Sequence, residues 1–346
     1  MAHRVVHAVD AWQRRHRWVG FPLGVIYKFA DDQGTYLTAL ITYYGFLSLF
    51  PLLLLLVTVL GFVLQHDAGL QARVVDSTLA QLPIIGTQLG QDVRPLTGSG
   101  LGLAAGILGT LYGCLGAAGA LQHAFNKVWA VPRNERPNPI SLRLRGLLLL
   151  LVLGAGALVT TALSSFTTSA RTFGADVDTV LAIAAVPLGT LANFALFMLA
   201  FRVLTVSEVH TRELRAGAAV AAVGWQVLQL LGTYLVTRLL TGAPAAYGTF
   251  GLVLGLIAWI YLLSLVIVLA AEVNVVAQRH LWPRALLTPF TDSVQLTTAD
   301  ERAYTAYAES ERHKGFEVID VDFEQPTDTE HRSASDAGQA VPDGDG

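Results

Sequence analysis

The sequence predicts an all-α, polytopic membrane protein with six transmembrane helices, an N-terminal amphipathic segment and a disordered acidic C-terminal tail. Three observations predict this class. Hydrophobic residues make up 53% of the 346 residues and charged residues only 14%, whereas soluble domains average about 25% charged residues. Six apolar segments each have the length of a bilayer-spanning helix. Basic residues are concentrated in alternate loops between those segments.

Residues 1–36 form a basic and amphipathic segment that we place in the cytoplasm. Arginines alternate here with Trp12 and Trp18, a combination typical of a helix in the headgroup region of a membrane. A plain basic flank that orients the first span is the alternative interpretation. The residues leave both interpretations open.

The transmembrane domain covers residues 37–280, with spans at about 37–64, 100–121, 146–166, 179–204, 216–240 and 250–277. Pro51 in the first span and Pro187 in the fourth each remove one helix hydrogen bond and therefore predict a kink. The second span has glycines at steps of three or four, which places positions without side chains on one face and predicts close helix packing. These are Gly102, Gly106, Gly109, Gly113 and Gly116.

The distribution of Lys and Arg predicts the orientation. With the N-terminus inside, the cytoplasmic segments up to Arg284 hold 15 Lys and Arg residues, and those on the outer side hold 4. Cytoplasmic loops carry the excess of basic residues in membrane proteins. We therefore expect both termini in the cytoplasm, in a multi-pass protein of the bacterial inner membrane.

Polar side chains within the apolar spans are the candidates for function. Glu272 follows more than twenty residues without a charge, and a charge within hydrocarbon costs from about 2.5 to more than 10 kcal/mol. Either Glu272 binds a proton or cation in a cavity, or it is an interfacial acid held by an arginine or by another helix. The other candidates for a cavity lining are Asn274, Asn193, Tyr43, Tyr44, Gln226 and Gln229, although amides at this depth commonly join helices.

Motifs of several enzyme classes are absent from the sequence. The nine histidines are scattered without the spacing of a zinc site, and neither a GxSxG elbow nor a GxxxxGK[ST] loop occurs. The basic residues are those that orientation already requires, so they predict no nucleic-acid surface. We expect no enzymatic activity, no metal and no cofactor, and we expect membrane lipids as partners.

The tail at residues 285–346 differs in character, with 14 acidic and 4 basic residues. Its last part has no apolar pattern and is predicted to be mostly disordered. Thr298 and Glu301 have the spacing of a capping box, which predicts a short helix through Arg312. Acidic and apolar residues alternate over 317–323, which fits either a docking peptide for a cytoplasmic protein or a solvated tail.

Motifs distributed over about residues 25–280 resemble the YihY/BrkB family of bacterial inner-membrane proteins, formerly labelled ribonuclease BN. They are Tyr43 and Tyr44 with Leu49, Phe50 and Pro51; the segment from Ala120 to Trp129 with Asn126; Tyr247, Gly248 and Gly251; Trp259 and Tyr261; and Ala271, Glu272 and Asn274. The sequence departs from the family at Ala270, where the family usually has glycine. The resemblance implies six spans and an inner-membrane location, but no settled activity.

Three hypotheses of function follow. In the first, the protein transports a solute or handles lipid or envelope components, and Glu272 and the other polar residues border a cavity. In the second, it is a non-transporting scaffold whose acidic tail recruits a cytoplasmic protein. The third, a membrane-bound ribonuclease, is suggested only by the family's former label.

Overall fold

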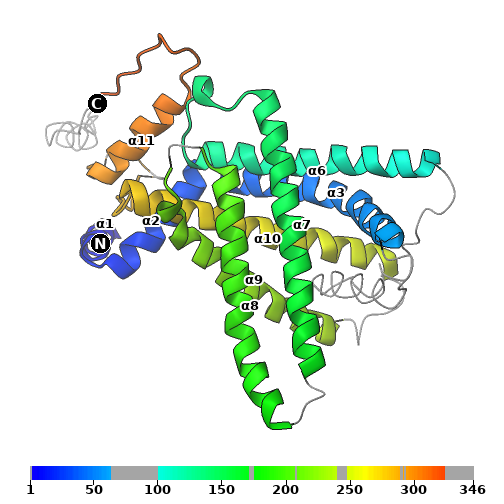
Figure 1. Cartoon of the computed structure of the whole chain (residues 1–346). Coiled ribbons are helices and arrows are strands. Elements are labelled where there is room, and N and C mark those ends of the chain that lie inside the picture. The colour runs from blue at the N-terminus through cyan, green and yellow to red at the C-terminus, as the bar shows by residue number, and fades with distance from the viewer. Residues whose placement is uncertain are drawn as a thin grey trace, which may run out of the picture. The chain divides into compact units, whose positions relative to one another are not determined.

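A computed structural model describes residues 2–63, 100–170, 175–206, 209–239, 248–288, 291 and 294–323. These residues contain no strand, which confirms the all-α class. The helices are α1 (Ala2–Arg15), α2 (Arg17–Asp31), α3 (Gly34–Val63), α6 (Gly100–Val128), η1 (Arg133–Glu135), α7 (Pro139–Ala170), α8 (Ala175–Leu204), η3 (Thr211–Leu214), α9 (Arg215–Leu239), α10 (Gly248–Arg279) and α11 (Thr298–Ser310) (Figure 1).

Each predicted span overlaps one long helix, namely α3, α6, α7, α8, α9 or α10. Even the shortest of these, α9, has 25 residues, which is about 38 Å at the usual helical rise. Within the part of the chain that the structure describes, four segments are both long and apolar enough to cross a membrane. They are Pro139–Gly156, Pro187–Leu204, Thr211–Gly232 and Val253–Arg279.

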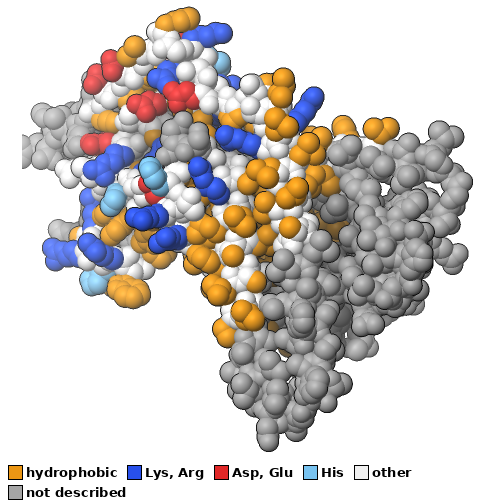
Figure 2. Space-filling view, in the orientation of Figure 1, with side chains coloured by type: hydrophobic (Ala, Val, Ile, Leu, Met, Phe, Trp, Pro, Cys, Tyr) orange, Lys and Arg blue, Asp and Glu red, His pale blue; other side chains and the backbone are white. Residues whose placement is uncertain are grey.

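Large apolar side chains point outward on these helices. Leu151 on α7, Leu191 on α8 and Leu230 on α9 are all exposed, and hydrophobic side chains cover much of the described surface of α7 and α8 in Figure 2. A soluble protein rarely leaves so large an apolar surface in water. The exposed face of these helices therefore suits lipid as its surrounding solvent.

Two helices extend beyond the predicted spans. The polar pair Gln122 and His123 suggests an end for the second span, yet α6 continues to Val128 because Phe125 is buried and packs at 5.1 Å against the ring of Phe201. Ala130, with a φ of 47°, then ends the helix in a left-handed conformation. Similarly, α7 begins at Pro139 and includes Arg143 and Arg145, which precede the predicted start of the third span at about residue 146.

The chain divides into two compact units. We call the described residues within 1–28, 132–135 and 276–346 the terminal unit, and those within 29–131 and 136–275 the bundle unit. In the bundle unit, α3 and α6 pack closely through glycines. A Cβ atom on Gly113 would lie 2.8 Å from Cα of Ser48, and one on Gly116 would lie 2.6 Å from the ring of Tyr44.

Other predicted packing and kink positions are described only in part. For Pro51, Gly102 and Gly106 the structure describes the helical backbone but not the surroundings, and α3 continues through position 51. Pro187 lies inside α8. Gly109 is half-buried on α6.

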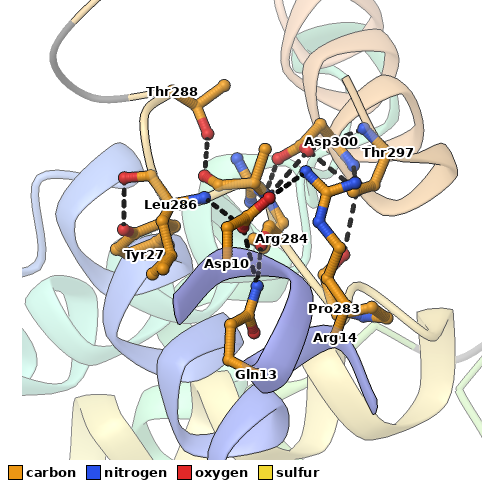
Figure 3. Close-up of polar contacts among 11 residues, drawn as sticks. Asp10, Gln13, Arg14, Tyr27, Pro283, Arg284, Leu286, Thr288, Thr297 and Asp300 are labelled. Carbon is orange, nitrogen blue, oxygen red and sulfur yellow. Dashed lines mark hydrogen bonds and ion pairs between the residues drawn. The ribbon is translucent and has the colours of Figure 1, made fainter. Parts of the chain in front are cut away.

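The terminal unit is held together by a buried polar network (Figure 3). The guanidinium of Arg284 forms an ion pair with Asp300 of α11, and both side chains are buried. The side-chain amide of Gln13 on α1 donates a 2.7 Å hydrogen bond to the carbonyl of Arg284. The backbone N–H of Leu286 donates to Asp10 at 3.0 Å, and the hydroxyl of Tyr27 donates to the carbonyl of Leu286 at 2.9 Å.

The first part of the tail therefore differs from the expectation of a mostly disordered segment. The predicted short helix is present as α11, but its capping pair is Thr297 and Asp300 rather than Thr298 and Glu301. The C-terminal end of α11 is tied to η1, because Arg133 pairs with Glu311 at 2.6 Å and Arg312 pairs with Glu135. Residues 324–346, which include the most polar part of the predicted tail, lie outside the described residues.

Candidate functional site

The best-defined polar contact within the bundle unit joins α9 to α10. Asn274 is 0% exposed, and its side-chain Oδ1 accepts a 2.6 Å hydrogen bond from the backbone N–H of Gly217. Gly217 lies in the first turn of α9, where N–H groups lack partners four residues earlier within the helix. Asn274 therefore supplies a side-chain cap to α9 from the neighbouring helix.

The contact requires glycine at position 217. A Cβ atom there would lie 2.1 Å from the carbonyl oxygen of Ala270 and 2.4 Å from Nδ2 of Asn274. About two turns farther along, a Cβ on Gly224 would lie 2.6 Å from Val266. Small residues on α9 thus allow its backbone to approach α10 closely, as is common between membrane helices.

The Nδ2 atom of Asn274 is buried and has no hydrogen-bond partner among the described residues. A buried donor without a partner costs about 1–3 kcal/mol. Such a group is available to a water molecule or to an acceptor on a ligand. The amide of Asn274 therefore combines a structural role at its oxygen with a free hydrogen-bonding capacity at its nitrogen.

Glu272 is also 0% exposed. Residues two positions apart on a helix are separated by about 200° around its axis, so Glu272 and Asn274 face different neighbours. Val268, Ala271 and Val275 on the same part of α10 are buried as well, whereas Val273, between the two polar residues, is only half-buried. The prediction that both side chains border one cavity stays a prediction; in the structure the two side chains lie at one level of α10 and point about 200° apart.

A second group of buried polar residues lies on α3 and α10, and the sequence analysis missed it. The hydroxyl of Thr38 donates to the carbonyl of Gly34, that of Thr42 to Thr38, and that of Ser264 to Ile260, each at 2.7 Å. Their donors are thus satisfied within their own helices, and the hydroxyl oxygens keep acceptor capacity. The spacing of Thr38 and Thr42, four residues apart beside buried Leu37 and Ile41, was the signal that could have identified this face.

The remaining predicted residues are more exposed. Tyr43 is 62% exposed and packs edge-on against Tyr44 at 5.2 Å. Asn193 on α8 and Gln226 and Gln229 on α9 are half-buried. Gln226 and Gln229 lie nine and twelve residues after Gly217, about 14 and 18 Å along the helix. They are therefore at a different depth from Asn274.

The terminal unit contains a cleft of about 630 Å³, lined in part by Arg279, Thr298, Glu301, Arg302 and Phe323. None of the polar residues predicted from the spans lines it. The described residues contain no group of three or more His, Cys, Asp or Glu side chains that could hold a metal ion. The buried polar positions of the bundle unit are therefore the better candidate for function in the membrane.

Comparisons with known proteins agree with a membrane protein. A family model described as virulence factor BrkB matches residues 25–289. An uncharacterized protein of Dickeya dadantii is 31% identical over 257 residues, which cover 68% of this chain and 76% of the relative. Inner membrane protein YhjD of Escherichia coli is 26% identical over 253 residues, covering 68% and 74%. A ribonuclease-like protein of Bacillus subtilis, YfkH, is 24% identical over 261 residues, covering 73% and 93%. No solved structure matches.

Proposed function

The chain belongs to the BrkB family of membrane proteins, and from this premise we propose that it transports a solute or handles lipid through the buried polar positions of α10. The observation that carries the proposal is a carboxyl group and an amide, Glu272 and Asn274, that are both fully buried in a helix long and apolar enough to cross a membrane. Ionisable groups within membrane helices mark ion, proton and substrate pathways in many proteins.

The chemistry of this level of α10 suits a polar ligand. The N-terminal end of α9 carries partial positive charge and lies beside Asn274, and transporters use such helix ends to bind charged groups near interrupted helices. The Nδ2 group of Asn274 offers a hydrogen-bond donor to a ligand. The carboxyl group of Glu272 is able to accept and release a proton on the other face of the same turn.

The functional test is rescue of a knockout strain. Glu272→Gln keeps the size of the side chain and removes its proton exchange, and we expect it to lose rescue of flux and envelope phenotypes while its membrane level stays normal. Glu309→Gln, the same change on an exposed acid of α11, is the matched control and should rescue. Full rescue by Glu272→Gln would remove Glu272 from the proposed mechanism.

We also propose six crossings with both termini in the cytoplasm. Support comes from the terminal unit, in which η1 and α11 are joined by ion pairs and α1 is hydrogen-bonded to residues after α10. Segments in such contact must lie on one side of the membrane, so the chain crosses an even number of times between residues 28 and 132 and again between 135 and 276. The excess of basic residues in these segments favours the cytoplasmic side.

Thiol labelling tests this orientation. In a Cys114→Ala background, single cysteines at Asn134 and Val318 should react with a membrane-impermeant maleimide only in inside-out vesicles. A cysteine at Arg73, in the predicted outer loop, should react in intact cells. Labelling of position 134 or 318 in intact cells would contradict the proposed orientation.

A scaffold remains the second candidate, because part of the acidic tail is folded into the terminal unit and exposes apolar side chains at Phe316 and Val318. Deleting the whole tail is a poor test, since it would remove Asp300 and the rest of α11 and so disrupt the terminal unit itself. The better variant is Phe316→Ser/Val318→Ser. A scaffold should lose function with this variant at normal membrane level, whereas a transporter should keep it.

We propose no enzymatic activity for this chain. The word ribonuclease occurs in the family's former label and in the name of one relative, and neither identifies a catalytic group in this chain. Purified protein incubated with RNA, with and without Mg²⁺ or Mn²⁺, should leave the RNA intact. Metal-dependent cleavage that co-purifies with the wild-type chain would contradict this proposal.

A further inference from the structure

The helix α2 carries its apolar side chains on its exposed face. Trp18 is 91% exposed and Ile26 is 57% exposed, and Pro22, midway between them, is exposed as well. These three residues follow one another at steps of four and therefore form one stripe along the helix. The opposite, buried face holds Gly20, Gly24, Val25 and Lys28.

The buried face is closely packed within the terminal unit, so the exposure of the stripe is not caused by a loosely placed helix. A Cβ on Gly24 would lie 3.0 Å from both the carbonyl oxygen of Leu281 and Cβ of Trp282. The ammonium group of Lys28 lies 5.1 Å from the centre of the Tyr307 ring. A helix of a water-soluble unit buries its apolar stripe, whereas α2 presents the apolar stripe outward.

Basic groups accompany the stripe at its N-terminal end. Arg15 and Arg17 are exposed, and Arg14 is paired with Asp10 at 2.6 Å. On α1, Trp12 adds a further exposed aromatic ring. Lys and Arg side chains gather over the region of α1 and α2 in Figure 2. Exposed tryptophan and aliphatic residues with a basic collar are the features of a helix that lies in the interface of an anionic membrane.

Chain connectivity places one end of α2 at the membrane boundary. Only Asp32 and Gln33 separate the end of α2 at Asp31 from the start of α3 at Gly34, and α3 is the first expected span. Trp18 lies 13 residues before Asp31, about 20 Å along the helix. A helix that stood upright would hold Trp18 far out in water, whereas one that lay flat would immerse the whole stripe.

We propose that α2 lies flat in the headgroup region of the membrane, with Trp18, Pro22 and Ile26 in the acyl boundary and Arg15 bound to phosphate groups of anionic phospholipids. The terminal unit is thereby docked on the lipid surface by an element outside the spans. This proposal rests on insertion of the chain into a membrane and not on transport, so it survives if Glu272 has no role in flux.

Depth measurement by spin labelling tests the proposal. The full chain, with Cys114→Ala, carries one nitroxide at Trp18→Cys, Pro22→Cys or Ile26→Cys in nanodiscs that hold a single copy and contain phosphatidylcholine with phosphatidylglycerol. All three labels should collide more with oxygen than with a water-soluble nickel chelate, at similar depths of about 5–10 Å below the headgroups. Val318→Cys, on an exposed residue of the tail, is the control and should report water.

The other outcomes overturn the proposal in recognisable ways. A steady gradient from a shallow Ile26 label to a Trp18 label in water would show an upright helix. Low collision rates with both reagents at all three positions would show that a protein surface covers the stripe. Strong collision with the nickel chelate at all three would show a helix in water.

A second arm tests the anionic lipid. With the label at Trp18→Cys, we expect Arg15→Gln to lower the ratio of immersed to aqueous label about fivefold, since one arginine contributes about 1 kcal/mol near an anionic surface. Arg302→Gln, an equal change of charge on α11, should leave the ratio unchanged. An equal ratio for Arg15→Gln and wild type, in discs with and without phosphatidylglycerol, would overturn the assignment of Arg15 to anionic headgroups.

Discussion

The backbone N–H of Gly217 donates a 2.6 Å hydrogen bond to the side chain of Asn274, 57 residues farther along the chain. This bond fixes the start of α9 against a turn of α10 that also holds the buried carboxyl group of Glu272. The position of the proposed site therefore depends on a contact between two helices. Substitution of either residue should therefore lower the melting temperature of the protein, which can be measured without a functional assay.

Gly217→Ala should destabilise the protein. The added Cβ would overlap the carbonyl of Ala270 and the amide of Asn274, and overpacking of this kind costs about 1–3 kcal/mol. Cys114 is buried and is the single cysteine, so a thiol-reactive dye reports unfolding in detergent directly. Gly189→Ala is the control, because no atom lies within 4 Å of its added Cβ. Equal melting temperatures for the two variants would contradict close packing at Gly217.

Asn274→Ala should lower stability through the lost cap. Removing a side-chain cap from a helix N-terminus typically costs about 1 kcal/mol, and the buried N–H of Gly217 would be left without its acceptor. The same melting assay measures the loss. Asn193→Ala, at a half-buried amide on α8, is the control and should lower the melting temperature less. An equal or larger effect of Asn193→Ala would contradict a specific capping role for Asn274.

Asp300→Ala should loosen α11. Removing one partner of a buried ion pair costs about 3–5 kcal/mol, because the other charge stays buried, here on Arg284. We expect faster cleavage by trypsin at Arg302 within α11. Glu309→Gln, on an exposed acid of the same helix, should leave the rate unchanged. The double variant Arg284→Met/Asp300→Leu should restore only part of the protection, because Asp300 also caps α11 together with Thr297; protection of Asp300→Ala equal to wild type would contradict a structural role for the pair.

The turn at residues 313–317 should depend on pH. The backbone N–H groups of His313 and Lys314 donate hydrogen bonds to the Glu317 carboxylate. These bonds, that of His313 most strongly, lower the pKa of Glu317 from its ordinary value of 4.5. A carboxyl with a lowered pKa stabilises the folded turn above its ordinary pKa, and this contribution is lost as pH falls through the lowered value. A spin label at Val318→Cys should become more mobile below pH 4.5, the ordinary pKa of the group, and Glu317→Gln should be mobile at every pH. If the mobility of the label did not change with pH while Glu317 is present, this stabilising role of the Glu317 carboxylate would be contradicted.

The long helices were predictable because length and hydrophobicity are local properties of the sequence. The long helices α8, α9 and α10 begin and end within a few residues of the predicted spans. The spacing of Gly113 and Gly116 indicated a packing face, but only the structure shows that this face meets Ser48 and Tyr44. Likewise, the charge of Glu272 made this residue a candidate, but only the structure shows that the side chains of Glu272 and Asn274 are both fully buried.

The terminal unit was not predictable in the same way. Its polar contacts join residues far apart in the sequence, such as Gln13 and Arg284, which are separated by 271 positions. Composition indicated a solvated acidic tail, because it holds 14 acidic residues and only 4 basic ones. The ion pair of Arg284 and Asp300 leaves neither buried charge unpaired where α11 packs against the rest of the unit, and such a pairing has no signal in hydrophobic periodicity.

Reconstitution into liposomes is the direct test of transport through Glu272. Purified wild-type protein, Glu272→Gln and the control Glu309→Gln would be compared in two assays, transbilayer movement of fluorescent phospholipid and proton movement reported by an internal dye. The account predicts movement above that of protein-free liposomes for wild type and Glu309→Gln in at least one assay, and at least a tenfold lower rate for Glu272→Gln. Equal rates for wild type and Glu272→Gln would contradict it, as would wild-type rates no higher than those of empty liposomes.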